Sequence, residues 1–319
     1  MTVGTTTPGG EPAADGGDGM GDGISGGTGR SASAYRSGNR VLAAGLHFVS
    51  TPIGAARDIT LRALDMLSAA DVLAAEDTRT LRHLMEIHGI ALAGRSLVAY
   101  HEHNAGTAHP RLLAAMAEGK SVVYASEAGT PLVSDPGFGL ARGAIARGFP
   151  VQAAPGASAV LCALVSSGLP SDRFLFAGFS PTTRSARMKF LNEMKDTRAT
   201  LILFESPKRV YGLLADCVQC FGEERQAAVC RELTKKFEEV SRGTLGVLAH
   251  AFEGREVKGE IVVLVDRGTV QAASADDVAA ALREAMKTMS VKDAAGAVAK
   301  TLGLARRDLY QMALKEADR

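Results

Sequence analysis

Charged side chains gather at two points in the second half of the chain, each directly after an apolar segment of strand type. The first cluster is residues 204–209 (FESPKR), and the second is residues 231–239 (RELTKKFEE). Carboxylates in such clusters can take up a proton, and arginines can hold phosphate oxygens through a planar fork of N–H groups. A solvated, ion-paired surface is the alternative interpretation, because it explains most runs of mixed charge.

Basic residues clearly outnumber acidic ones only between residues 184 and 209. Such a stretch suits an RNA backbone, since affinity for phosphates comes from clustered lysines and arginines. A solubilising helix face would have the same composition. The formal net charge of the chain is only +1, so any nucleic-acid surface must be a local patch.

Three Gly/Pro turns in the first half indicate a different kind of site. They are residues 50–54 (STPIG), 126–131 (SEAGTP) and 155–159 (PGASA), each after a predicted strand. Glycine lets backbone amides approach a ligand closely, and proline fixes a turn. Ligands of α/β sheets bind where such loops converge, so the turns predict a small-molecule pocket.

Two nucleotide-binding signatures are absent from the sequence. Without a G-x-x-x-x-G-K-[ST] motif, a P-loop NTPase is disfavoured. Without a G-x-G-x-x-G after the first strand, a Rossmann dinucleotide enzyme and the commonest methyltransferase fold are disfavoured too.

Strands and helices alternate from Leu46 onward, which predicts an α/β fold. The alternation in the first half predicts a mostly parallel sheet, and the second half suits a second α/β layer whose strand order the sequence does not give. The expected strands are 46–50, 71–75, 97–100, 121–125 and 151–154, then 174–179, 199–204, 226–230 and 260–265. The expected helices are 60–69, 81–88, 111–118 and one after Pro155-Gly156, then 186–194, 210–220 and 244–252. We therefore expect α/β domains at 46–168 and 169–270, and a small appendage of three amphipathic helices at 275–317. Within the appendage, Ser290 and Asp293 predict the start of a helix and Gly303 its end. The appendage resembles a helix-turn-helix module, for which packing or dimer support is as plausible as RNA contact.

Residues 1–45 hold 13 of the 35 glycines and almost no large apolar side chain, which predicts a disordered tail. The four cysteines do not form a disulfide framework, and the pair Cys217 and Cys220 lacks a second CxxC for zinc. We expect structural thiols and no metal. With no apolar run long enough to span a membrane and no secretory signal, a cytoplasmic protein is expected.

Nine ordered motifs carry a family resemblance. They are STPIGAARDITLRAL, AAEDTR, YHEHN, SEAGTPLVSDPG, PGASA, SGLPSDRFLFAGF, FESPKR, RELTKKFEE and KGEIVV. They resemble the ribosomal RNA small subunit methyltransferase I family of the tetrapyrrole methylase superfamily, over residues 46–265. The resemblance implies two α/β domains with S-adenosylmethionine in the cleft between them, and a homodimer. It also implies methylation of the ribose 2′-hydroxyl of a cytidine in the decoding region of small-subunit rRNA.

Site residues follow from the resemblance position by position. The expected cofactor-binding residues are Pro52, Ser126, Glu127, Ala128, Gly129, Thr130, Pro131, Ser158 and Ala159. Glu205 and Glu232 are the expected catalytic carboxylates, and the expected RNA-binding residues are Arg184, Arg187, Lys208, Arg209, Arg231 and Lys235. The chain has Glu127 where the family usually has Asp, and Ala55 where it usually has Asn. Both departures concern cofactor affinity rather than reaction type.

Two other functions stay open at the level of the sequence. One is a methyltransferase of the same fold that acts on a tetrapyrrole or on a protein side chain. The other is a non-catalytic ribosome-assembly factor that binds RNA through its basic stretch. Binding of S-adenosylmethionine would separate the assembly factor from both enzymes.

Overall fold

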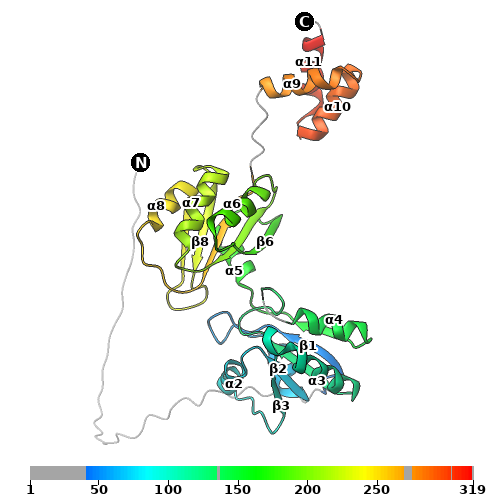
Figure 1. Cartoon of the computed structure of the whole chain (residues 1–319), viewed down its shortest axis with the longest axis vertical. Coiled ribbons are helices and arrows are strands. Elements are labelled where there is room, and N and C mark those ends of the chain that lie inside the picture. The colour runs from blue at the N-terminus through cyan, green and yellow to red at the C-terminus, as the bar shows by residue number, and fades with distance from the viewer. Residues whose placement is uncertain (1–40, 135–136, 269–274, 303, 318–319) are drawn as a thin grey trace, which may run out of the picture. The chain divides into compact units, whose positions relative to one another are not determined.

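The computed structural model describes residues 41–134, 137–268, 275–302 and 304–317. Most of the predicted disordered tail therefore lies outside the described residues. Two five-stranded sheets, each with helices packed on its faces, and a set of three C-terminal helices make up the described chain (Figure 1). The expected fold class, α/β with a helical extension, is confirmed.

The first sheet is parallel throughout, with the strand order β3-β2-β4-β1-β5. Its strands are β1 (Gly45–Val49), β2 (Val72–Ala75), β3 (Ser96–Ala99), β4 (Ser121–Ala125) and β5 (Val151–Ala154). In the central register, Leu46 of β1 lies beside Val122 of β4 and Val151 of β5. Because all five strands point the same way, the loops that follow them meet at one edge of the sheet.

Helices cover both faces of the first sheet. Side chains of β1, β2 and β4 alternate between the faces, as the period of two requires. One face packs on α3 (Ala105–Ala117) and α4 (Phe138–Ala146), and the other on α1 (Leu61–Ala69) and α2 (Thr78–Ile87). The helix α4 was not expected from the sequence.

The second sheet is mixed, with the strand order β6-β7-β10-β8-β9. Its strands are β6 (Phe174–Phe179), β7 (Thr200–Glu205), β8 (Gln226–Arg231), β9 (Glu239–Thr244) and β10 (Ile261–Val265). Only β6 and β7 run parallel to each other, and the remaining pairs are antiparallel. The edge strand β9 was not expected, because its sequence EVSRGT carries a single large apolar residue.

The two faces of the second sheet are covered by different parts of the chain. One face packs on α6 (Arg184–Glu193), α7 (Val210–Phe221) and α8 (Leu245–Phe252). The other face packs on α5 (Ala159–Ser167), whose Val160, Ala163 and Leu164 lie against side chains of β7, β8 and β10. The sequence interpretation grouped this helix with the first half, whereas in the structure it packs on the second sheet. The domain boundaries themselves stay predictions.

Three helices follow residue 274: α9 (Ala275–Met286), α10 (Val291–Leu302) and α11 (Arg306–Ala317). They share a small apolar core, as the amphipathic pattern predicts. The expected start of α10 is confirmed, because the Ser290 hydroxyl accepts a hydrogen bond from the backbone N–H of Asp293 at 3.2 Å. The predicted stop at Gly303 falls on a residue that the structure does not describe.

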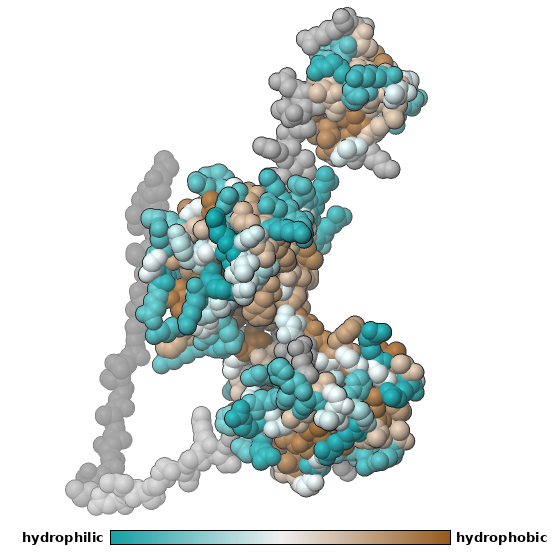
Figure 2. Space-filling model, in the orientation of Figure 1, coloured by the Kyte–Doolittle hydropathy of each residue, from teal (hydrophilic) through white to brown (hydrophobic). Residues whose placement is uncertain are grey.

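Cys217 and Cys220 are buried in α7 and form no disulfide, and burial raises the pKa of both thiols. Both hydrophilic and hydrophobic residues reach the visible surface, in teal and brown in Figure 2. Within the described ranges, no helix is long and apolar enough to cross a membrane.

Candidate functional site

A cavity of about 530 Å³ lies at the carboxyl edge of the first sheet. Its lining comes from the loops after β1, β4 and β5 and from the loops next to β7 and β10 of the second sheet. Of the residues expected at a cofactor, six line it: Glu127, Ala128, Gly129, Thr130, Ser158 and Ala159. Glu205 lines it as well. The volume is that of a small-molecule site.

Backbone hydrogen bonds tie two of the first-sheet loops together. Thr51 and Gly129 exchange both of their backbone hydrogen bonds, at 2.9 and 3.1 Å between N and O. Gly129 has a φ of +81°, and a Cβ there would lie 3.2 Å from Cγ2 of Ile53. Glycine is thus required by conformation and by space, which explains the turn after β4.

Two hydroxyl groups donate hydrogen bonds that stabilise the loops after β4 and β5. Ser126 is buried and donates to the carbonyl of Gly129, while Thr130 donates to the carbonyl of Ala157 at 3.0 Å. Ser126 therefore shapes the turn instead of lining the cavity. Pro52 and Pro131, also expected at the cofactor, are absent from the lining too.

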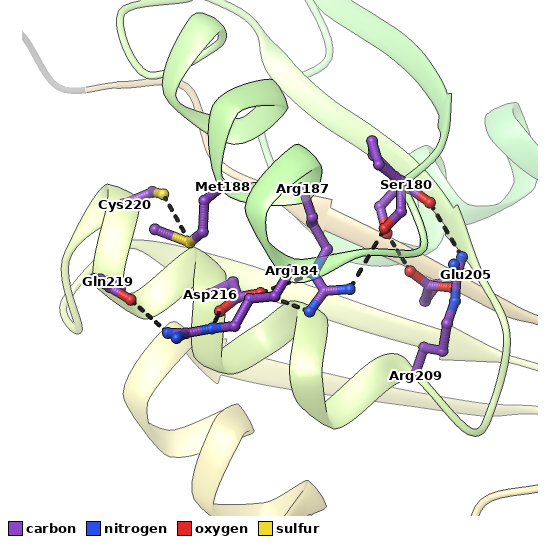
Figure 3. A network of polar contacts seen from close by, with 10 residues as sticks. Ser180, Arg184, Arg187, Met188, Glu205, Arg209, Asp216, Gln219 and Cys220 are labelled. Atoms are coloured by element: carbon purple, nitrogen blue, oxygen red, sulfur yellow. Dashed lines mark hydrogen bonds and ion pairs between the residues drawn. The ribbon is translucent and has the colours of Figure 1, made fainter.

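Both carboxylate oxygens of Glu205, at the end of β7, accept hydrogen bonds. Its buried carboxylate accepts hydrogen bonds from the Ser180 hydroxyl, from the Ser206 backbone N–H at 2.7 Å and from Nε of Arg209 at 2.6 Å. Arg209 also donates to the Ser180 carbonyl at 3.1 Å (Figure 3). A carboxylate with these partners holds the Ser206 turn in place, so Glu205 is a positioning candidate rather than a free base. The Arg209 guanidinium is likewise engaged in hydrogen bonds, to Glu205 and to the Ser180 carbonyl.

Arg187 is the clearest correction among the predicted RNA-binding residues. It lies buried on α6, and its Nη2 is 2.7 Å from Oδ2 of the buried Asp216 on α7. The exposed Arg184 binds the other carboxylate oxygen of Asp216 at 2.9 Å, as Figure 3 shows. Because a buried, paired guanidinium cannot meet a phosphate, the helix face that the sequence suggested is in part a structural contact between α6 and α7.

Glu232 is absent from the residues that line the cavity, which makes it a candidate for positioning like Glu205. Its Oε1 accepts from Nζ of Lys235 at 2.9 Å and from the backbone N–H of Glu260 at 3.0 Å. The hydrogen bond from Lys235 lowers the pKa of Glu232, which makes it a weaker base. Lys235 also lies 3.2 Å from Oε2 of Glu260, a carboxylate on the cavity wall.

Arg231 is engaged in an ion pair of its own, because its Nε lies 3.1 Å from Oε2 of Glu239. Lys208 is the remaining predicted RNA contact, and its side chain is exposed. Of the six predicted phosphate contacts, Lys208 and Arg184 are the exposed ones, whereas the others are partly or wholly buried in ion pairs.

The loops of the two sheets meet directly beside the cavity. A Cβ on Gly54 would lie 2.7 Å from Oγ1 of Thr234 and 2.5 Å from Cγ of Lys235. Only glycine allows this approach. The sequence indicated the turn at Gly54 but not its partner, since nothing local marks a contact across 180 residues.

Two family models match the chain. Residues 45–249 match the tetrapyrrole (corrin/porphyrin) methylases, and residues 272–317 match a C-terminal helix-turn-helix domain. A protein of Mesorhizobium japonicum named ribosomal RNA small subunit methyltransferase I is 48% identical over 88% of this chain and 94% of its own length. The chain belongs to the tetrapyrrole methylase family, in its small subunit methyltransferase I branch. A second relative of the same name, from Mycobacterium tuberculosis, is 41% identical over 83% of this chain and 93% of its own length.

Among solved structures, a cobalamin biosynthetic enzyme, cobalt precorrin-4 methyltransferase, superposes on this methylase with a TM-score of 0.53. The two share 19% sequence identity, and the match covers 69% of this chain and 94% of the other. Diphthine synthase superposes with the same TM-score at 18% identity, covering 69% of this chain and 89% of the other. At this level of identity the likeness shows the fold alone.

As a tetrapyrrole methylase, the chain uses S-adenosylmethionine as its methyl donor. The cavity fits this cofactor in size and chemistry. Ile53, Val160, Ile261 and Val262 offer apolar contacts. The carboxylates of Glu127 and Glu260 suit the positive charges of a sulfonium and an ammonium group. Ile53, Gly259 and Glu260 are lining residues that were not among the expected cofactor contacts.

Proposed function

We propose that this methylase transfers a methyl group to the 2′-hydroxyl of a cytidine ribose in the decoding region of small-subunit rRNA. The observation that carries the proposal is the match to relatives named ribosomal RNA small subunit methyltransferase I along nearly their whole length. A cavity lined by loops of both sheets supports it, since one side can hold the cofactor while the other meets a large substrate.

S-adenosylmethionine supplies an electrophilic methyl group on sulfur when it is bound. The protein must then align the ribose oxygen with that group and accept the hydroxyl proton. Alignment alone can supply about 7–11 kcal/mol of the barrier. We assign alignment to the loops held by Glu205 and Glu232. Glu127, which lines the cavity, is the candidate to take the proton.

The proposed cofactor contacts are the backbone and side chains of residues 127–130 and 158–159, joined by Ile53 and by residues 259–262. The proposed RNA contacts are Lys208 and Arg184, which are exposed. With only these two of the six predicted contacts exposed, a shaped ribosomal particle fits better than a free oligonucleotide, because many weak contacts then replace one strong field.

We also propose that the enzyme is a homodimer. Exposed apolar side chains on α5, Leu161 and Val165, are of the kind that a second copy covers. Light scattering of the purified chain tests this. A molar mass of two chains is expected, and a mass of one chain would refute it.

A competition assay tests the substrate class. Purified small ribosomal subunits, a tetrapyrrole and an acceptor protein are offered together with S-adenosylmethionine that carries a labelled methyl group. Label in the RNA alone is the expected result. Label in the tetrapyrrole or the protein would favour the corresponding alternative enzyme. Binding of the cofactor in calorimetry without label in any acceptor would contradict all three substrate assignments.

A further inference from the structure

Phe179 presents an aromatic ring to solvent on the wall of the cavity. It is the last residue of β6, its side chain is 57% exposed, and it lines the cavity together with Phe204. Burying a large aromatic side chain is strongly favourable. An exposed aromatic ring on the wall of a ligand site can therefore stabilise a ligand that covers it.

A β-bulge aims this ring at the cavity. In a regular strand, Phe176 and Phe179 would point to opposite faces of the sheet, since they are three residues apart. The pairing of β6 with β7 shifts between Phe176 and Gly178, so Phe176 lies beside Ile202 and Phe179 beside Phe204. Both phenylalanines consequently face the same side as Ile202 and Phe204. Gly178 has a φ of +73°, which glycine adopts without strain.

One ring contact orients Phe179, and a second one orients its partner Phe204. Its centroid lies 5.5 Å from that of Phe204 at an interplanar angle of 68°, and Phe176 packs on Phe204 from 4.7 Å at 62°. The neighbouring Ser180 is anchored by Glu205 and Arg209 (Figure 3). Phe179 is thus held by its backbone and by the contact with Phe204, while more than half of the residue stays exposed. Little side-chain entropy is therefore lost when a ligand covers the ring.

We propose that Phe179 is a stacking platform for a nucleobase. The inference rests on the proposed function, which requires a nucleotide of the RNA to bring its ribose to the cavity. Bases of single-stranded or splayed-out RNA are recognised by stacking on aromatic side chains. The adenine of the cofactor is a second source of the same chemistry. The exposure of Phe179 at the rim favours the RNA base, because the apolar lining at Val160 and Ile261 is more deeply buried.

Three substitutions separate stacking from mere burial. Phe179→Leu keeps an apolar side chain but removes the ring, and Phe179→Tyr keeps the ring. Phe174→Leu is the matched control, because Phe174 is 43% exposed on the same strand and lies outside the cavity lining. For each purified protein we would measure the Kd of S-adenosylmethionine by calorimetry, and KM and kcat for methylation of small ribosomal subunits.

Loss of one base–aromatic stack corresponds to about a 5- to 150-fold loss of affinity. We expect Phe179→Leu to raise KM for small subunits by that factor with an unchanged cofactor Kd. Phe179→Tyr should restore KM, and Phe174→Leu should match the wild type. A raised cofactor Kd in Phe179→Leu, restored by Phe179→Tyr, would also support stacking and would name adenine as the base.

Unchanged KM and Kd in Phe179→Leu would overturn the proposal. So would a defect that Phe179→Tyr shares in full, or a loss of activity that follows a change of molar mass in light scattering. If the wild-type protein binds the cofactor but does not methylate small subunits, the proposed function fails. The cofactor titration then decides the stacking claim alone, and an unchanged Kd in Phe179→Leu would end it.

Discussion

The hydroxyl oxygen of Thr234 accepts a hydrogen bond from the backbone N–H of Ala55, 3.1 Å away. This bond joins the loop after β1 to the loop after β8. Ile53 on the first loop lines the cavity, and Lys235 on the second contacts Glu260, which also lines it. The Thr234 side chain therefore links the two walls of the cofactor site, and the backbone of Thr234 has a φ of +63°.

Replacing Thr234 with valine should weaken this connection, because valine keeps the volume and removes the acceptor. A lost hydrogen bond of this kind costs about 0.5–1.5 kcal/mol. We expect a Kd for S-adenosylmethionine that is several-fold higher, with a small loss of thermal stability. Thr234→Ser keeps the hydroxyl and should behave as the wild type. Equal cofactor affinity in the valine and serine variants would show that the bond does not position the site.

Gly259→Ala should mimic the loss of Glu232. A Cβ at Gly259 would lie 2.4 Å from Cδ of Glu232, so the carboxylate must leave Lys235 and the Glu260 backbone. The φ of +94° adds backbone strain, of about 1–3 kcal/mol. We expect lower turnover and weaker cofactor binding than in the wild type.

Gly254→Ala is the control for Gly259→Ala. Gly254 also has a positive φ, +65°, but a Cβ there would meet no atom within 4 Å. It should lower the melting temperature and leave turnover unchanged. If both alanine variants lose turnover equally, backbone strain and not the Glu232 contact is the cause.

Asp216→Asn should destabilise the fold and not alter RNA binding directly. Asp216 is 2% exposed and holds the buried Arg187, and removing one partner of a buried pair costs about 3–5 kcal/mol. Asp172→Asn removes the exposed pair with Arg267 and should cost no more than about 1 kcal/mol. Denaturant titration of both variants checks this. Equal midpoints for the two would contradict a structural role of the buried pair.

Glu239 should stabilise the protein in a pH-dependent way. The guanidinium of Arg255 and, to a smaller extent, that of Arg231 lower the pKa of Glu239 to about 2. Because the folded pKa is below the unfolded one, the stabilisation is present above the unfolded pKa and is lost as the pH falls toward 2. We expect Glu239→Gln to cost about 1 kcal/mol at pH 7, after solvent screening, and less at pH 3. A difference that does not shrink with acid would refute this.

Local patterns predicted most elements of the fold. The strands at 121–125, 151–154 and 174–179 were expected with the bounds that the structure has, because apolar runs between turn residues mark buried strands. The edge strand β9 was missed, since a strand with few buried side chains leaves little pattern. The helix α4 was missed as well, in a segment rich in glycine and alanine that was taken for loop and connection.

The site was predictable where chemistry lies in a single motif. Residues 127–130 line a cavity, as predicted. This prediction was possible because a glycine turn after a strand can be recognised directly in the sequence. The tertiary contacts of individual side chains could not be predicted from the sequence in this way. Arg187 is paired with Asp216, 29 residues away, and Phe179 owes its direction to a bulge that no residue type marks alone. Tertiary packing decides both.

The most direct test of the proposed reaction is nucleoside mass spectrometry of small-subunit rRNA. Small subunits that lack the modification would be incubated with the purified methylase and S-adenosylmethionine labelled in the methyl group, and the rRNA digested to nucleosides and to mapped fragments. We predict label in 2′-O-methylcytidine from the decoding region. Label on a base or on another nucleoside, or unlabelled rRNA with a protein that binds the cofactor, would contradict the account.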